Sequence, residues 1–78
     1  MIIPAQKGFY VIYKEGKELF VGKTPVIAWL LDDAHYVMPI TTDGLEDHCA
    51  GYLNPNGSVS ILEDSYDSLE EAKKAISE

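Results

Sequence analysis

The sequence predicts an α+β domain, an antiparallel meander of five or six strands with one C-terminal helix. Short runs of aromatic and β-branched residues recur along the chain, and clusters of turn residues separate them. The stretch with helical periodicity comes last. A sheet curled into a barrel-like shape is equally compatible with this order, and the 78 residues form a single domain, 1–78.

The first hairpin is predicted in residues 8–21. Residues 8–13 (GFYVIY) are rich in the side chains that favour a pleated strand, and residues 19–21 return as its partner. Gly16 can adopt the positive φ that a tight turn between them requires. Pro25 has no amide donor for a sheet, so we expect a bend, a bulge or a sheet edge there.

The most apolar run of the chain, residues 26–31 (VIAWLL), shows no alternation of polar and apolar positions. This pattern predicts a central strand that is buried on both faces or bends between two packed layers, with a short buried helix as the alternative. Residues 36–41 form the next strand, in which Pro39 indicates an edge position or a bulge. A turn at residues 42–44 and a polar loop at residues 45–48 follow.

A second hairpin and the helix complete the chain. Residues 49–53 and 58–62 flank the turn Asn-Pro-Asn-Gly at residues 54–57. Residues 68–77 form the helix, because Ser68 and Glu71 have the spacing of a capping box. Leu69, Ala72 and Ile76 form one apolar stripe, which we expect to pack on the sheet.

The charge of the chain is negative and segregated. Thirteen carboxylates and six lysines give a net charge of −7, and the chain has no arginine. This composition argues against direct nucleic-acid binding, which needs a basic surface. Between residues 24 and 72 there are ten carboxylates and no lysine. These carboxylates either keep the protein in solution or form an acidic face for a basic partner protein.

Other features point to the cytoplasm. The single cysteine, Cys49, cannot form an internal disulfide, which suits a reducing compartment. Residues 1–7 lack the pattern of a signal peptide, and no apolar run approaches the roughly 20 residues needed to cross a bilayer. We therefore expect a cytoplasmic protein that does not bind membranes.

The sequence contains no strong catalytic motif, so we expect no enzymatic activity and no cofactor. His35, Asp47, His48 and Cys49 have side chains that can bind zinc. However, neighbouring residues in an extended segment point to opposite sides, and no second cysteine completes a tetrahedral set. We interpret residues 43–49 as a polar loop that leads into a strand, with no metal.

Aromatic residues give the best indication of a contact surface. In residues 9–13 one face of the strand must be core, and the other face still carries aromatic or aliphatic groups. In a chain this small, that second face stays uncovered unless the helix or a partner lies over it. The candidate partner-binding residues combine two tyrosines with the nearby carboxylates. They are Tyr10, Tyr13, Asp32, Asp33, Asp43, Glu46 and Asp47.

Five segments resemble the short, uncharacterised proteins encoded by phages and prophages. They are residues 3–9 (IPAQKGF), 25–29 (PVIAW), 39–44 (PITTDG), 54–59 (NPNGSV) and 67–68 (DS). The resemblance spans most of the chain and implies no activity and no functional residues. It implies a context in which small proteins act by binding and redirecting a host protein.

The leading hypothesis is therefore a non-enzymatic protein-binding module, an accessory protein of a phage or mobile element that binds a basic host factor through an acidic, tyrosine-containing surface. A structural homo-oligomer, joined through a strand edge or the uncovered sheet face, is the first alternative. A small-ligand or metal-binding domain is the second.

Overall fold

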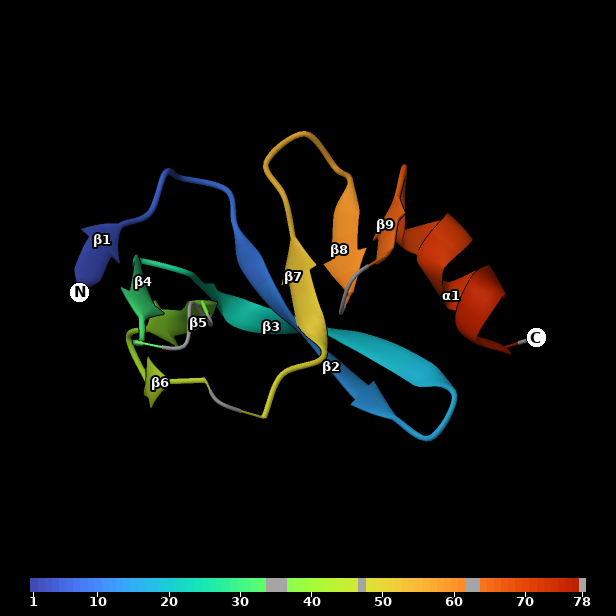
Figure 1. Ribbon diagram of the computed structural model, residues 1–78. Helices are drawn as coiled ribbons and strands as arrows, with labels where there is room; N and C mark the ends of the chain where they lie inside the picture. The colour runs from blue at the N-terminus through green and yellow to red at the C-terminus, as the bar shows by residue number, and fades with distance from the viewer. Residues whose placement is uncertain (34–36, 47, 62–63, 78) are drawn as a thin grey trace.

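The computed structural model describes residues 1–33, 37–46, 48–61 and 64–77. Within these residues, nine strands form two antiparallel sheets that do not close on themselves, and one helix follows at the C-terminal end (Figure 1). The predicted α+β class, the antiparallel pairing and the single C-terminal helix are confirmed. The strands divide between two sheets, where the sequence suggested one meander of five or six.

The four-stranded sheet has the order β1-β4-β5-β6. Its strands are β1 (Ile2–Pro4), β4 (Ala28–Leu31), β5 (Val37–Thr41) and β6 (Gly44–Leu45). None of the residues in these strands is charged. Strand β4 is central, as predicted for the apolar run, because it pairs with β1 on one side and β5 on the other.

The five-stranded sheet has the order β3-β2-β7-β8-β9. Its strands are β2 (Tyr10–Glu15), β3 (Glu18–Pro25), β7 (Gly51–Leu53), β8 (Val59–Ile61) and β9 (Asp64–Tyr66). Both predicted hairpins, β2-β3 and β7-β8, lie in this sheet. Pro25 is at its edge, next to an irregularity in the β2-β3 register, as its missing amide donor suggested.

The chain passes from one sheet to the other within two residues. The amide of Val26 donates to the carbonyl of Phe9, which precedes β2, over 2.8 Å. The amide of the next residue, Ile27, donates to the carbonyl of Ile40 in β5, also over 2.8 Å. The apolar run therefore bends between two packed layers, which is one of the two arrangements that its lack of alternation predicted.

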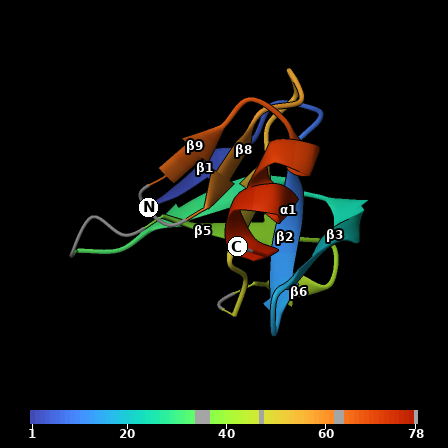
Figure 2. The ribbon, with the colours of Figure 1, turned by 90° about the vertical axis from the view of Figure 1, so that its right-hand side faces the viewer.

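Helix α1 (Leu69–Ser77) covers one face of the five-stranded sheet (Figure 2). The Oγ of Ser68 accepts a hydrogen bond from the amide of Glu71 at 3.2 Å, as the capping motif predicted. Ala72, fully buried, packs with Ile12 and Val59 in the main core cluster. A helix of nine residues is too short to be stable alone, so this packing holds it in place.

The opposite face of the five-stranded sheet packs against the four-stranded sheet. Trp29 of β4 meets Phe9 and Tyr52 with ring centroids 5.1 Å and 5.0 Å apart, both in edge-on geometry. The molecule therefore has three layers: helix α1, the five-stranded sheet and the four-stranded sheet (Figure 1). Both faces of β2 are covered, which is why the adjacent residues Val11 and Ile12 are both buried.

Pro39 lies inside β5, between β4 and β6, yet it causes no loss of pairing there. Its carbonyl accepts a hydrogen bond from the amide of Glu46 at 2.9 Å. In an antiparallel strand, the nitrogen and the carbonyl of one residue point to the same side. The missing donor of Pro39 therefore points past the end of β6, which stops at Leu45, so this position has the character of an edge.

Candidate functional site

The outer layer of the molecule leaves one sheet face uncovered. Because paired residues in an antiparallel sheet point to the same side, the register divides the four-stranded sheet into two faces. The face containing Trp29 points to the five-stranded sheet. We call the opposite side the outer face. Its first row is Ile2, Leu30 and Met38, and its second row is Pro4, Ala28, Ile40 and Leu45.

Every side chain of the outer face is apolar, and no described element packs on it. In Figure 1 the five-stranded sheet and helix α1 both lie to the right of the four strands. Ile2 is 65% exposed and Leu45 is 44% exposed. The central positions Leu30, Met38 and Ile40 are partly shielded by their neighbours in the sheet. Clustered apolar side chains on a surface mark contact sites in proteins.

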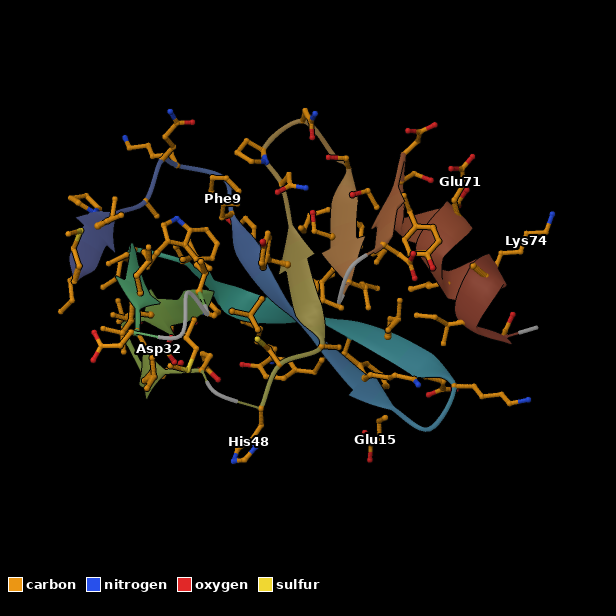
Figure 3. All side chains as sticks on the ribbon, in the orientation of Figure 1. Phe9, Glu15, Asp32, His48, Glu71 and Lys74 are labelled. Carbon is orange, nitrogen blue, oxygen red and sulfur yellow. The ribbon has the colours of Figure 1, made fainter. Side chains whose placement is uncertain are left out.

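Carboxylates stand at both ends of this sheet. The exposed residues Asp32 and Asp33 follow the last residue of β4, and Asp43 lies in the turn between β5 and β6. Figure 3 shows Asp32 beside the four-stranded sheet, far from Lys74 on the helix. The segment 26–53, which supplies three of the four strands, contains five carboxylates and no lysine. We call Asp32, Asp33 and Asp43 the acidic rim of the outer face.

A polar network lies between the layers, beneath the β5-β6 hairpin. The hydroxyl of Tyr13 in β2 donates to Oε2 of Glu46 at 2.8 Å. The hydroxyl of Thr41, which is buried, approaches Oε1 of the same carboxylate at 3.4 Å. Cys49 donates from its Sγ to the carbonyl of Glu46 at 3.5 Å. Glu46 therefore links the two sheets across 33 residues of sequence and holds β6 in position.

The environment of this network favours the neutral phenol. Partial burial raises the pKa of Tyr13 to about 12, and the hydrogen bond to Glu46 together with the negative charge of that carboxylate act in the same direction. The neighbouring Cys49 and Asp43 add smaller contributions of the same sign. Tyr13 therefore serves as a hydrogen-bond donor that ties the sheets together.

Replacing Tyr13 with phenylalanine is expected to lower the free energy of unfolding by about 1.5 kcal/mol, because the part-buried carboxylate of Glu46 loses its closest donor. The pH dependence has a defined sign. The pKa is about 12 in the folded protein and 10.0 in an unfolded chain, so the unfolded chain releases the proton first. The contribution of Tyr13 is therefore complete below pH 10 and is lost as the pH rises through 12.

Urea denaturation of both proteins between pH 8 and pH 12 checks this expectation. The wild-type protein should lose stability more steeply over the upper part of this range than the Tyr13→Phe variant does. Parallel curves for the two proteins would contradict the assignment.

The structure brings some of the sequence-predicted site residues together and separates others. Tyr13 and Glu46 meet between the sheets, and the hydroxyl of Thr24 approaches Oδ2 of Asp43 at 3.4 Å.

Tyr10 lies apart from them, on the other face of β2. It lines a hollow of about 450 Å³ formed with residues 5–8 and 25–27. Asp32 and Asp33 follow β4 as exposed residues. Asp47 lies outside the described residues.

A second hollow of about 520 Å³ separates the β2-β3 turn from the end of helix α1. Lys17, Lys73 and Lys74 line it together with Glu18, Leu19, Phe20 and Ser77. The charges that line it are mixed, and the hollow is open to solvent. Neither hollow was predicted from the sequence, and neither was the outer face. The signal for the outer face was present, because a strand without alternation is apolar on both sides.

The residues weighed as metal ligands do not form a site within the described part of the chain. No group of three or more histidine, cysteine, aspartate or glutamate side chains there could hold a metal ion. His48 is exposed, and Cys49 is half-buried with its thiol on the carbonyl of Glu46. His35, like Asp47, lies outside the described residues.

Comparisons with protein families, with curated proteins and with solved structures find no match to this chain. Over the described ranges, no helix has the length and apolar character needed to span a bilayer. The described residues thus define an α+β protein of three layers, in which none of these residues forms an element that packs on the outer face.

Proposed function

We propose that this chain is a non-enzymatic protein-binding module whose contact surface is the outer face of the four-stranded sheet. The observation that carries the proposal is the composition of this face. Seven apolar side chains form two rows without a charged residue, on a layer that no described element covers. Burying apolar surface contributes about 25 cal/mol per Å², so a partner on this face would gain binding energy from every row.

The arrangement of the layers supports the same proposal. The sequence hypothesis placed the uncovered face on the strand with Tyr10 and Tyr13. That strand is covered on both sides, by helix α1 and by the four-stranded sheet. A small chain with one helix and two sheets has one sheet face left over, and here it is the outer face. This face, with the acidic rim, takes the role of the acidic, tyrosine-containing surface that the sequence suggested.

Changing two residues of the outer face to glutamine tests the proposal. In the Ile2→Gln/Leu45→Gln variant we expect the Kd for the partner to rise by about tenfold or more, because truncating apolar anchors in an interface costs about 1–2 kcal/mol each. Both side chains are among the most exposed of the face, so folding should be unaffected. Phe20→Gln is the matched control, because Phe20 is 45% exposed and belongs to the five-stranded sheet.

The measurement uses tagged wild-type protein and both variants as baits in a host lysate at low salt. A protein captured by the wild type and by the control variant, but lost with the face variant, is then purified and its Kd measured by calorimetry. Equal capture and equal Kd for all three baits would refute the outer face as the contact surface.

A further inference from the structure

The composition of the outer face and its rim also restricts what the partner can be. The face has no charge of its own, while the acidic rim flanks it at both ends. Asp32 and Asp33 stand where β4 leads to β5, and Asp43 stands at the opposite end of the same strands. Glu46 does not contribute to this rim, because its carboxylate is part-buried and bonded to Tyr13. Asp43 stays exposed, although its Oδ2 lies 3.4 Å from the hydroxyl of Thr24 in β3.

A second copy of this chain fits the face poorly. Two-fold pairing of outer faces would bring the carboxylates of two rims together, and like charges repel at short range. The face is also small. Four strands about 4.8 Å apart and two rows about 7 Å apart give a footprint of roughly 250 Å², compared with about 800 Å² per partner in a typical stable interface. Apolar contact alone is therefore insufficient for a stable dimer.

A partner that contacts the acidic rim as well as the outer face avoids both limits. Its charges attract the rim, and its contact is not restricted to the small apolar area. Lysine or arginine side chains around an apolar patch would pair with Asp32, Asp33 and Asp43 while the patch covers the two rows. Complementary charge at a rim acts mainly on the rate of association, and salt weakens it. Complementary charge at the rim, combined with a small apolar centre, produces a rapid, reversible and salt-sensitive contact.

We infer that the outer face binds a partner protein that presents an apolar patch bordered by basic residues, and that it does so as a transient contact between two different proteins. This inference rests on the proposed function and specifies the partner of the same surface. The net charge of −7 and the absence of lysine from residues 24–72 extend the same field beyond the rim.

Two synthetic peptides test the inference without knowledge of the natural partner. The first is an amphipathic helix of leucine and lysine, and the second has the same pattern with glutamate in place of lysine. Each is titrated into isotopically labelled protein at low salt, and amide and methyl chemical shifts are recorded. We expect the lysine peptide to shift Leu30, Met38, Ile40 and the acidic rim, and to bind at least about tenfold more tightly than the glutamate peptide. Raising the salt to about 0.2 M should weaken it several-fold.

A matched pair of variants assigns the effect to the rim. In Asp32→Asn/Asp33→Asn/Asp43→Asn we expect the affinity for the lysine peptide to fall by about fivefold to tenfold. The control is Glu15→Gln/Glu18→Gln/Glu70→Gln. It removes the same charge from exposed positions in the five-stranded sheet and helix α1, and should leave the affinity within about twofold of the wild type.

The outcomes separate the inference from the proposed function. Equal binding of both peptides to the outer face would overturn the basic partner and leave the protein-binding proposal intact. Shifts confined to other surfaces, or no binding of either peptide, would overturn both. Face resonances that move with protein concentration alone, with a matching rise in molar mass by light scattering, would identify a second copy as the occupant and overturn the inference.

Discussion

Replacing Gly51 with alanine is expected to lower the free energy of unfolding by about 4 kcal/mol, a large part of the total stability of a domain of this size. Gly51 lies in β7, paired with Ile12 on one side and Ile61 on the other. A Cβ at this position would collide with the carbonyl oxygen of Ser60 and lie 2.9 Å from Cα of Ile61. These are backbone atoms of β8, so the strain can be relieved only by separating β7 from β8.

Gly22→Ala is the matched control, because Gly22 also lies in a strand of the same sheet. An added Cβ there would have its nearest neighbours, Cε2 of Tyr13 and the carbonyl oxygen of Val11, at 3.4 Å. We expect the free energy of unfolding to change by less than about 1 kcal/mol. Urea denaturation followed by the fluorescence of Trp29 measures both variants. Similar midpoints for the two would show that β7 and β8 are not packed as closely as described.

Local signals in the sequence predicted the elements of this fold well. The capping motif and apolar stripe located the helix, and the turn Asn-Pro-Asn-Gly located the β7-β8 hairpin. The short strands β1, β6 and β9 were not predicted, because two or three residues carry no periodic pattern. Their pairing depends on tertiary contacts, such as the backbone bonds between Met1 and Leu31.

The division into two sheets could not be predicted from local pattern. Pro25 indicated a break after β3, but a break does not say whether the next strand rejoins the same sheet or starts another. The two backbone bonds of Val26 and Ile27, which go to different sheets, decide this. The pairing of Tyr13 with Glu46 has the same origin, since it joins residues that only the packed layers bring together.

The sequence predicted that some apolar strand surface stays uncovered, but it could not predict which face of which sheet this is. The sequence showed more apolar strand surface than one helix can cover. Which face stays bare depends on where the helix docks, and Ala72 and Ile76 dock on the five-stranded sheet. Residues 26–31 are apolar on both sides, and they lie in a layer that has a partner sheet on one side only. Leu30 and its row therefore belong to the outer face, where they are partly shielded by their neighbours in the sheet.

Replacing Ile12 with alanine is expected to lower the free energy of unfolding by about 3–4 kcal/mol. Ile12 is fully buried in one cluster with Ala72 of helix α1 and Val59 of β8. Truncating such a side chain removes its transfer energy and leaves a cavity. Val21 is its cross-strand partner on β3 and is 36% exposed, so Val21→Ala should cost about 1 kcal/mol or less. Calorimetry and urea denaturation of both variants provide the comparison.

This expectation also separates stability from binding. Ile12 lies in the layer contact farthest from the outer face, so any loss of binding in Ile12→Ala should follow the unfolded fraction and disappear under conditions where the variant is folded. The Ile2→Gln/Leu45→Gln variant should behave in the opposite way, with wild-type stability and weakened binding. If Ile12→Ala bound weakly while fully folded, the contact surface would have to include the helix side of the five-stranded sheet.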